Sequence, residues 1–202
     1  MIRWRVFDIA VSLVGLIVFS PIILLCAIAT VLDSGLPTFN GAWRLGKHGT
    51  PFRCWKIRTL KAGHEAILES HLAENEAARK EWQTYAKLIE DPRVTHISRS
   101  LRRTSLDELP QLWNVLSGDM ACFGPRPFLA RERHVLGLSA HHLLAVRPGL
   151  ISAYTAHGRS RLTVEQRVKL DSKFARRMGR LGVKWDALTR TIWHCMRGTG
   201  AQ

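Results

Sequence analysis

Two adjacent carboxylates, Asp107 and Glu108, lie in the segment SLDELPQLWNV at residues 105–115. Neighbouring side chains on a helix point about 100° apart, so these two cannot oppose each other as the acid and base of a glycosidase do. Separate roles fit better: one carboxylate is a nucleophile, and the other binds a divalent cation. Mg²⁺ suits such a site because it accepts carboxylate and phosphate oxygens together. The pair therefore predicts phosphate chemistry, with both residues as catalytic groups and metal ligands.

A phosphoryl transfer also needs positive charge on the spectator oxygens and on the leaving group. The candidate phosphate-binding side chains are Lys56, Arg58, Arg102 and Arg126. Arg126 stands between Pro125 and Pro127 in the motif GPRP at residues 124–127. It therefore loses little conformational freedom when it binds a phosphate group.

The local sequence around the carboxylates predicts how they are held. Ser105, followed by Glu108 three positions later, is a candidate capping box, which would place Asp107 in the first helical turn. The helix dipole and unpaired amides there favour an ionised carboxylate. Pro110 would remove an early backbone hydrogen bond, so we expect a kinked or tightened turn. The alternative is that Ser105 and Glu108 only cap a helix and that Asp107 has no catalytic role.

Composition limits the partners and the kinds of site. The chain has 202 residues and a formal net charge of +14, which favours anionic partners such as nucleotides, phospholipid head groups or nucleic acid. Neither GxxxxGK[ST] nor GxGxxG occurs, so a P-loop and a dinucleotide fold are not supported. The four cysteines occur singly and the nine histidines lack metal-ligand spacing, which argues against zinc sites and a disulfide framework.

Between Asp8 and Asp33 the chain is almost wholly apolar, with polar side chains only at Ser12, Ser20 and Thr30. These roughly two dozen residues are enough to cross about 30 Å of hydrocarbon as a helix. The run is therefore predicted to be a membrane segment. A cleaved signal peptide is the alternative, but its apolar core is usually shorter.

Ser20 and Pro21 stand near the middle of this segment. Pro21 cannot donate a backbone hydrogen bond to Ile17, so the helix must kink or break there. Basic residues flank the segment on both sides: Arg3, Arg5, Arg44 and Lys47. The positive-inside rule would place both ends in the cytoplasm, which predicts a re-entrant turn at Ser20 and Pro21. A kinked helix that spans the bilayer remains the alternative.

The rest of the chain predicts a small, mainly helical α+β domain. Residues 52–57 alternate as in a short strand, and residues 64–90 show the spacing of one helix with an acidic outer face. Near the end, an apolar stripe recurs at helical spacing, formed by Trp185, Leu188, Ile192, Trp193 and Met196. This last helix suits either the lipid head-group region or an ordinary position on a protein core.

The segment at residues 91–127, DPRVTHISRSLRRTSLDELPQLWNVLSGDMACFGPRP, resembles the catalytic signature of the bacterial sugar transferases. These are the monotopic phosphoglycosyl transferases that start exopolysaccharide and glycan assembly. Similar pieces lie on both sides of it: Ser20-Pro21, FRCWKIRT at residues 52–59, Arg147-Pro148-Gly149, Gly158-Arg159 and RGTGA at residues 197–201. The resemblance thus covers nearly the whole chain.

The resemblance implies a fold, a location and a reaction. Residues 1–34 would form a membrane-embedded helix-break-helix segment, and residues 35–202 a catalytic domain on the cytoplasmic face of the bacterial inner membrane. Interfacial amphipathic helices would hold this domain at the membrane. A sugar 1-phosphate would pass from a UDP-sugar to undecaprenyl or another polyprenyl phosphate, with release of UMP. The implied partners are the UDP-sugar, the polyprenyl phosphate and membrane lipids, and not nucleic acid.

The resemblance also implies residue roles. Asp107 would form a covalent phosphosugar intermediate and Glu108 would help to bind Mg²⁺. Phosphate groups would be bound by Lys56, Arg58, Arg102 and Arg126, with Pro127 shaping the turn. Ser20 and Pro21 would turn the membrane helix back.

Two segments depart from the family pattern. The stretch ISAYTAH at residues 151–157 replaces a threonine-glycine-leucine stretch and a Gln-Val-Ser or Gln-Val-Asn, and AWRLG at residues 42–46 replaces Gln-x-Arg-x-Gly. The first affects sugar or uridine recognition, for which the candidate residues are Arg147, His157 and Arg159.

Residues 81–95 resemble members of the family that transfer galactose or glucose. An N-acetylated amino-sugar donor is the alternative within the enzyme class. Outside it, a non-catalytic membrane scaffold and a nucleic-acid-binding module remain alternatives. The net charge prompts the last of these, but the sequence has no stacking-aromatic or recognition-helix signature.

Overall fold

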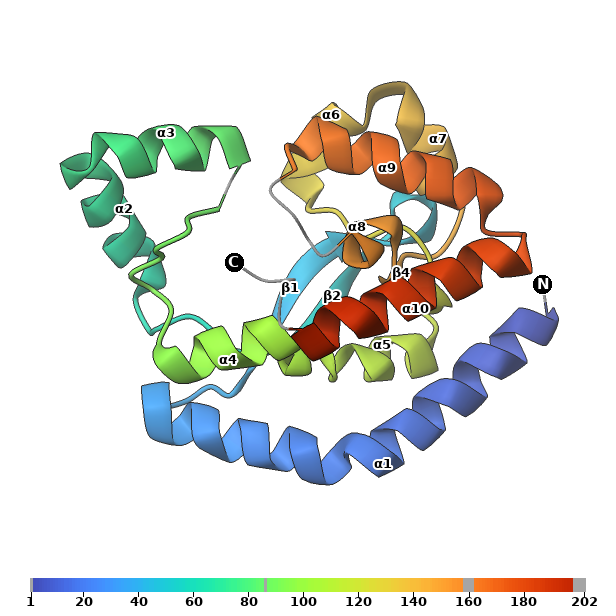
Figure 1. The fold of residues 1–202 in the computed structure, drawn as a ribbon, viewed down its shortest axis with the longest axis horizontal. Helices are drawn as coiled ribbons and strands as arrows, with labels where there is room; N and C mark the ends of the chain where they lie inside the picture. Colours follow the sequence, from blue (N-terminus) through green and yellow to red (C-terminus); the bar gives the residue numbers. More distant parts are fainter. Residues whose placement is uncertain (1, 86, 158–161, 198–202) are drawn as a thin grey trace.

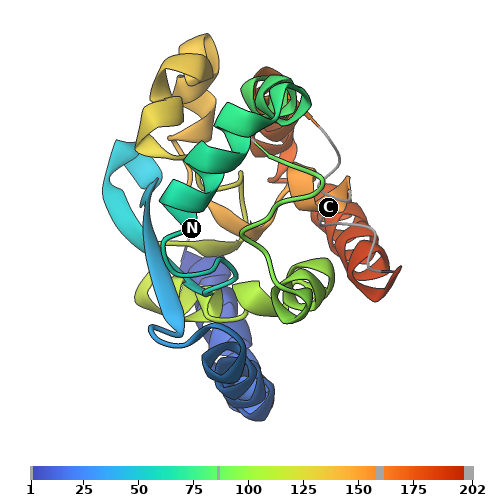
Figure 2. The same ribbon diagram turned by 90° about the vertical axis from the view of Figure 1, so that its left-hand side faces the viewer.

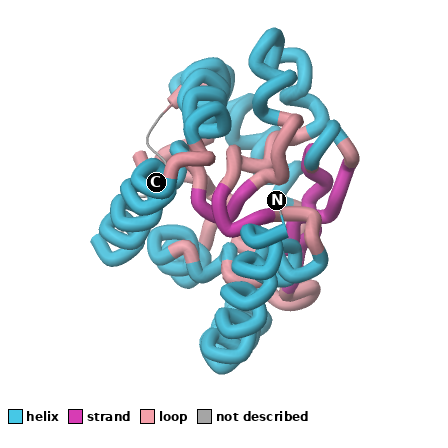
Figure 3. Tube along the Cα trace, turned by 90° about the vertical axis from the view of Figure 1, so that its right-hand side faces the viewer, coloured by secondary structure: helices cyan, strands magenta, loops and turns pink. Residues whose placement is uncertain are grey.

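The computed structural model describes residues 2–85, 87–157 and 162–197. Within these residues the fold is mostly helical, and its strands form two small sheets of two strands each. Figures 1 and 3 show the strands lying among helices that make up most of the trace. The prediction of a mainly helical α+β fold is confirmed.

The apolar run forms one helix, α1 (Ile2–Ser34), which is long and apolar enough to cross a membrane. Pro21 lies inside this helix. The Ser20 hydroxyl donates to the Ile17 carbonyl at 2.8 Å, which satisfies the acceptor that Pro21 leaves unpaired. Figure 1 shows α1 bent, with its concave side towards the rest of the protein. The segment is thus a bent but continuous helix rather than two helices separated by a break.

The face of α1 that packs against the protein contains polar side chains as well as Cys26. Asp8, Ser12 and Thr30 are buried there. Large apolar side chains are exposed instead, with exposed fractions between 61% and 81% for Ile17, Leu24, Leu25 and Leu32. A helix surrounded by water would have the opposite arrangement, because exposing so much contiguous apolar surface is unfavourable. The outer face of α1 therefore requires an apolar environment.

Both ends of α1 are fastened to the same body of the protein. Near its amino end, Arg5 donates to the carbonyls of Val115 and Leu116 at 2.6 and 2.7 Å. These carbonyls belong to the last turn of α5 (Gln111–Ser117), where a cation also interacts well with the helix dipole. At the other end, Arg58 donates to the Ser34 carbonyl at 2.6 Å. The catalytic elements thus hold α1 along its length.

The first sheet is an antiparallel hairpin of β1 (Phe39–Leu45) and β2 (Pro51–Ile57), joined through the 3-10 turn η1 (Lys47–Gly49). Phe52 and Cys54 point inwards from β2 and pack with Val115, Met120 and Cys122. This alternation matches the sequence pattern, so the predicted strand at residues 52–57 is confirmed.

The second sheet pairs β3 (Ala121–Phe123) with β4 (Gly149–Ile151) in parallel. Just beyond β3 the two segments approach so closely that a Cβ on Gly124 would lie 2.3 Å from the Arg147 carbonyl oxygen. Only glycine fits such an approach. The sheet thereby fixes the turn at residues 124–127 beside the start of β4.

The prediction of a single helix at residues 64–90 is wrong. The segment forms two helices, α2 (His64–Glu74) and α3 (Glu76–Tyr85), drawn in green in Figures 1 and 2. Asn75 separates them with an extended backbone, and its side-chain oxygen accepts from the Ala78 N–H at 3.0 Å. Asparagine favours such a cap over a helix interior, because its side chain competes for backbone hydrogen bonds. Residues 87–90 are not helical.

The second half of the chain adds helices around the sheets. They are the short α6 (Arg133–Leu136), α7 (Ala140–Leu143) and α8 (Ala153–Ala156) and the longer α9 (Val164–Arg177) and α10 (Leu181–Arg197), with 3-10 turns η3 (Ala130–Glu132) and η4 (Gly137–Ser139). One core cluster beneath α9 contains Leu45, Phe128, Leu136, Leu143 and Val168.

The amphipathic helix predicted near the end is α10, and its apolar stripe faces outwards. Trp185 and Trp193 are exposed, whereas Lys184 and Ala187 are buried. The tryptophans of the stripe therefore do not pack on the core of this chain. Exposed tryptophans beside cations suit a lipid head-group region.

Candidate active site

Asp107 and Glu108 lie on a tight turn between two helices. The helix α4 (His96–Thr104) ends at Ser105, which has a left-handed backbone with φ of 63°. The two carboxylates follow in the 3-10 turn η2 (Leu106–Glu108), and α5 begins only after Pro110. The predicted tightened turn is confirmed.

The predicted capping box at Ser105 and Glu108 is wrong, because the Ser105 side chain makes no capping hydrogen bond. With Ser105 in the left-handed region, its carbonyl accepts from the Glu108 N–H instead, at 3.1 Å. The cap of α4 is Thr95, whose hydroxyl oxygen accepts from the Ser98 N–H at 3.1 Å. Asp107 thus lies on the connection between α4 and α5, rather than in the first turn of an α-helix.

Both carboxylates are buried, with 5% of Asp107 and 8% of Glu108 exposed. Glu108 forms an ion pair with Lys56, which reaches it from β2. Water screens such a partly buried pair less than a surface pair, so Lys56 holds Glu108 firmly. The site therefore joins β2 to the turn after α4.

Asn114 fixes the distance between these two elements. Its side-chain oxygen accepts from the Trp55 N–H at 2.9 Å, and its amide nitrogen donates to the Arg53 carbonyl at 2.7 Å. Asn114 is almost fully buried on α5, so it clamps this helix to the strand that carries Lys56. The sequence analysis missed this role, since a buried asparagine carries no distinctive spacing.

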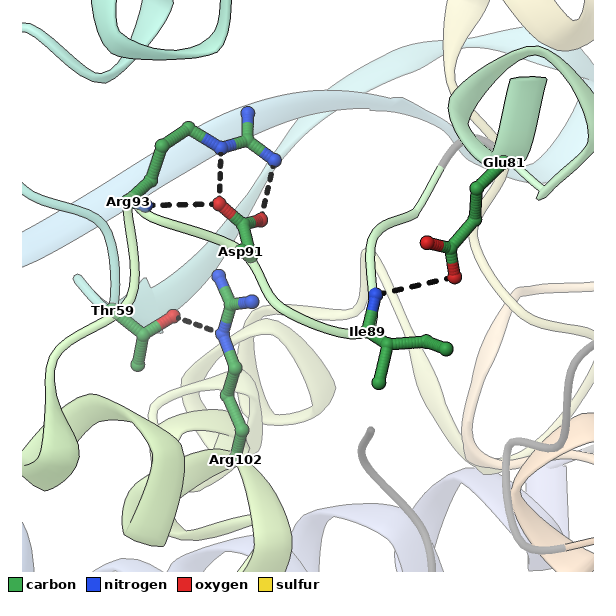
Figure 4. A network of polar contacts seen from close by, with 6 residues as sticks. All are labelled: Thr59, Glu81, Ile89, Asp91, Arg93 and Arg102. Atoms are coloured by element: carbon green, nitrogen blue, oxygen red, sulfur yellow. Dashed lines mark hydrogen bonds and ion pairs between the residues drawn. The ribbon is translucent and has the colours of Figure 1, made fainter. Parts of the chain in front are cut away.

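Arg102 is brought next to the carboxylates by α4. Its Nε donates to the Thr59 hydroxyl at 2.8 Å, as Figure 4 shows. Burial lowers the pKa of Arg102, while the charges of Asp107 and Asp91 oppose that shift. Arg102 therefore lies within electrostatic reach of Asp107.

A buried ion pair supports this arrangement from the preceding loop. Arg93 donates to both oxygens of Asp91, at 2.8 and 2.6 Å, in the bidentate geometry drawn in Figure 4. Burial alone would raise the pKa of Asp91, but the hydrogen bonds from Arg93 outweigh it and the pKa is lowered. The guanidinium of Arg93 also stacks 5.1 Å from the ring centroid of Trp82 on α3.

Arg58 is placed differently from the other predicted cations. Its guanidinium donates to the carbonyls of Ser34 and Gly35 at the carboxyl end of α1. Cations favour this end of a helix, where carbonyls lack intrahelical partners. In this structure Arg58 holds the carboxyl end of α1, whereas Lys56, Arg102 and Arg126 interact with the carboxylates.

Arg126 follows β3 in the turn that contains the buried Pro127. Burial alone would lower the pKa of Arg126, but the charges of Tyr154 and Glu108 oppose burial and the pKa is raised overall. The side chain of Arg126 therefore interacts electrostatically with both. The Arg126 N–H donates to Asp171 of α9 at 2.9 Å. Asp171 also accepts from the Tyr154 N–H at 3.2 Å and thereby ties this turn to the start of α8.

The candidate donor-recognition residues lie further along the chain. Arg147 is exposed just before β4, and His157 is exposed at the end of α8, where its Nδ1 lies 2.7 Å from the Ala153 carbonyl oxygen. Arg159 lies outside the described residues.

The chain as a whole was compared with known proteins. The family described as bacterial sugar transferase matches residues 1–198. The chain belongs to the bacterial sugar transferase family. This match covers α1 as well as the carboxylate turn, so the membrane helix is part of what the family shares.

Three relatives of this bacterial sugar transferase illustrate the range of similarity. An undecaprenyl-phosphate galactose phosphotransferase from Salmonella typhimurium is 38% identical over 85% of this chain and 36% of its own length. The exopolysaccharide production protein ExoY from Sinorhizobium fredii is 37% identical over 84% of this chain and 75% of its own length. A putative undecaprenyl-phosphate N-acetylgalactosaminyl 1-phosphate transferase from Bacillus subtilis is 40% identical over 61% of this chain and 60% of its own length.

The chain spans only about a third of the length of the Salmonella relative. The similarity to this bacterial sugar transferase is therefore to one part of that longer protein.

The carboxylates of the bacterial sugar transferase were tested for their fit to Mg²⁺. Among the described residues, no group of three or more His, Cys, Asp or Glu side chains could enclose a metal ion. Two neighbouring carboxylates, Asp107 and Glu108, nevertheless offer the oxygen ligands that Mg²⁺ prefers when phosphate oxygens and water complete its shell. The donor set thus fits Mg²⁺ bound together with a phosphorylated substrate.

Proposed function

We propose that this bacterial sugar transferase moves a hexose 1-phosphate, of galactose or glucose, from a UDP-sugar to undecaprenyl phosphate and releases UMP. This would be the first membrane step of exopolysaccharide or glycan assembly. The proposal is carried by the buried turn with Asp107 and Glu108, where Lys56 pairs with Glu108 and Arg102 interacts electrostatically with Asp107. The names of the Salmonella and Sinorhizobium relatives, a galactose phosphotransferase and an exopolysaccharide production protein, support it.

The reaction would proceed in two displacements at one phosphorus atom. An ionised oxygen of Asp107 attacks the phosphorus that carries the sugar, and the bond to the bridging oxygen breaks, so that its electron pair leaves with UMP. A phosphate oxygen of the lipid then attacks the same phosphorus and displaces the Asp107 carboxylate. The product is a sugar linked to the lipid through a diphosphate, and the enzyme is regenerated.

The surrounding cations have separate tasks in this scheme. Arg102 and Arg126 bind spectator oxygens of the transferred phosphate, whose charge they offset. Lys56 orients Glu108. Asp107 and Glu108 would hold Mg²⁺, which would supply positive charge at the phosphate oxygens.

The membrane arrangement is part of the same proposal. Residues 1–34 form the membrane segment and residues 35–202 the catalytic domain, with both ends of α1 on the cytoplasmic face. The contacts of Arg5 with α5 and of Arg58 with Ser34 support it, because they hold both ends of α1 against one body of protein. The bend of α1 at Ser20 and Pro21 supports a re-entrant path.

The covalent route can be tested without the lipid acceptor. Enzyme mixed with UDP-galactose or UDP-glucose and Mg²⁺ is expected to release UMP in a burst of up to one per active site. Intact-protein mass spectrometry should then show an added hexose phosphate. Asp107→Asn should abolish both signals, since the amide is a poor nucleophile. Asp186→Asn, in an exposed pair with Arg190, is the matched control and should behave like the parent.

UMP release that requires the lipid acceptor would contradict the covalent intermediate and indicate direct transfer instead. If Asp107→Asn still transferred hexose phosphate to the lipid at the rate of the parent, the assignment of Asp107 as the nucleophile would be wrong.

A second donor class has one observation in its favour. The Bacillus relative is named for N-acetylgalactosaminyl 1-phosphate transfer. The same burst assay with UDP-N-acetylgalactosamine distinguishes the two donors, because only an accepted donor leaves its mass on Asp107.

A further inference from the structure

The ring of Tyr154 is buried among three cations from separate segments of the chain. The Arg126 and Arg167 guanidinium carbons lie 4.9 and 5.8 Å from the ring centroid, and the Lys87 Nζ lies 5.2 Å from it. Lys87 also donates a hydrogen bond to the Tyr154 hydroxyl. Lys87 comes from the loop before α4, Arg126 from the turn after β3 and Arg167 from α9. We call these four residues the Tyr154 cluster.

In the described part of the chain, acidic groups act on the cations of the Tyr154 cluster only through longer-range electrostatic interactions. Among the described residues, no ion pair joins Lys87, Arg126 or Arg167 to an acidic side chain. Arg167 is only 8% exposed, and its buried Nε has no hydrogen-bond partner in this part of the chain. A buried donor without a partner is unfavourable and rare in folded proteins.

The acidic groups nearby are engaged elsewhere. Asp171 accepts from the backbone N–H groups of Arg126 and Tyr154, and Glu132 accepts from the Leu129 N–H at 2.8 Å. Glu108 pairs with Lys56. Contacts with an aromatic face attract each cation only weakly, whereas the three like charges repel one another in a region of low dielectric constant. Because no described acidic group forms an ion pair with these cations, the cluster can accept an anionic ligand.

Arg126 connects this cluster to the catalytic carboxylates. It interacts electrostatically with both Tyr154 and Glu108. In a nucleoside diphosphate sugar the two phosphates share one oxygen, so a phosphate at Asp107 would place its neighbour close to Arg126. We propose that the Tyr154 cluster binds the nucleotide-side phosphate of the donor, with Arg126 bridging it to the transferred phosphate. The cluster would keep its hold on the same phosphate in UMP until UMP leaves. The inference rests on the proposed function, because it assumes a nucleoside diphosphate donor.

The position of the cluster favours a water-soluble ligand over the lipid acceptor. Figure 1 shows α9, which carries Arg167, on the side of the molecule away from α1, with α5 and α10 between them. In the proposed function the lipid phosphate would reach the site from the side of α1, because the outer face of α1 is apolar. UMP and the lipid acceptor are both phosphate monoesters, so the experiment has to distinguish the binding of one from that of the other.

The test compares the parent, Arg167→Gln and the control Arg177→Gln as full chains in lipid nanodiscs. Arg177 is exposed near the end of the same helix. Titration calorimetry measures the binding of UMP, of uridine and of a short-chain prenyl phosphate. Arg167→Gln is expected to weaken UMP binding by about tenfold or more, since it removes charge-assisted hydrogen bonds to phosphate. Uridine and prenyl phosphate should bind as in the parent, and Arg167→Lys should recover part of the loss.

Unchanged UMP binding in Arg167→Gln would overturn the inference, and so would a loss confined to prenyl phosphate. If Arg167→Gln does not fold, Lys87→Met replaces it, because Lys87 lies on a loop and is only half-buried. Binding of UMP needs no turnover, so this result is independent of the burst assay. An Asp107→Asn variant that still transfers hexose phosphate, while UMP binding depends on Arg167, would count against the proposed mechanism alone.

Discussion

At the scale of single residues, Asp171 shows how a buried charge is used to hold the site. It is completely buried, and burial raises its pKa to about 6 despite hydrogen bonds from the backbone of Arg126 and Tyr154. The turn that carries Arg126 and the start of α8, which carries Tyr154, are thus both held by the Asp171 carboxylate. No part of this role is visible in the motif at residues 124–127, because Asp171 lies far along the chain on α9.

The raised pKa of Asp171 predicts a particular dependence of stability on pH. Between about pH 4 and pH 6 the folded state keeps a proton that the unfolded chain has already released. The contribution of Asp171 to the free energy of unfolding therefore falls as pH rises through this window, by on the order of 2–3 kcal/mol. Asp171→Asn should lack this component, as measured by denaturant unfolding in detergent between pH 4 and pH 7.

Other carboxylates titrate in the same range, so the comparison is between variants. Asp186→Asn changes an exposed side chain on α10 and should keep the pH dependence of the parent. Equal slopes in the parent and Asp171→Asn would contradict the prediction.

At the scale of elements, the site depends on how β2 and α5 are joined. Asn114 accepts from the Trp55 N–H and donates to the Arg53 carbonyl. Its side chain thus makes hydrogen bonds to β2 that a neighbouring strand could otherwise make. The clamp sets the position of Lys56 relative to Glu108. Local sequence fixes each element, but this contact crosses about sixty residues of chain.

Asn114→Ala is expected to lower the free energy of unfolding by about 2–4 kcal/mol, because two buried backbone groups lose their partners. UMP release should fall as well, since Lys56 is no longer held opposite Glu108. Thermal unfolding and the burst assay measure the two effects.

Ser117→Ala is the control on the same helix. Ser117 is exposed and bonds to the exposed Asp119, so its loss should change stability by less than about 0.5 kcal/mol. A loss for Asn114→Ala no greater than that for Ser117→Ala would show that the clamp is unimportant.

At the scale of the whole molecule, α1 lies with its polar face inwards and its apolar face outwards. The catalytic body contacts both ends of this helix through Arg5 and Arg58. A helix that crossed the bilayer would separate its ends by the thickness of the membrane, and one of these contacts would be lost.

We therefore predict that both ends of α1 are reached from one side of the membrane. The variant Leu36→Cys and a cysteine-bearing tag at the amino end are each introduced separately into a Cys195→Ser background. A membrane-impermeant maleimide should label both in inside-out vesicles and neither in intact spheroplasts. Leu36 is well exposed beyond the helix, so its cysteine is accessible. Labelling of the two sites from opposite sides would establish a spanning helix and refute the re-entrant arrangement.

Much of this organisation is predictable from sequence because it depends on neighbours along the chain. The apolar run, the strand at residues 52–57 and the tight turn around Pro110 follow from local composition and backbone sterics. The prediction of a single helix at residues 64–90 was wrong at Asn75, because the Asn75 side chain caps the second helix and interrupts the helical spacing. The capping box at Ser105 failed because a left-handed residue ended the preceding helix.

A pattern could also have pointed to part of the Tyr154 cluster. Arg167 and Asp171 are four residues apart on the inner face of α9, which also carries the buried Val168 and Phe174. Charged residues at apolar positions of an amphipathic helix indicate a buried polar site. Their partners on α8 and in the loop before α4 have no corresponding signal.

Sequence alone predicts a pair of carboxylates for phosphate chemistry and a membrane helix, and it carries the signature of the bacterial sugar transferases. Tertiary structure decided which cation serves which purpose. Lys56 meets Glu108, Arg58 instead holds the end of α1, and Arg167 joins Arg126 at Tyr154. The physical reason is that charge and hydropathy belong to each residue, whereas pairing depends on folded segments that are far apart in the chain.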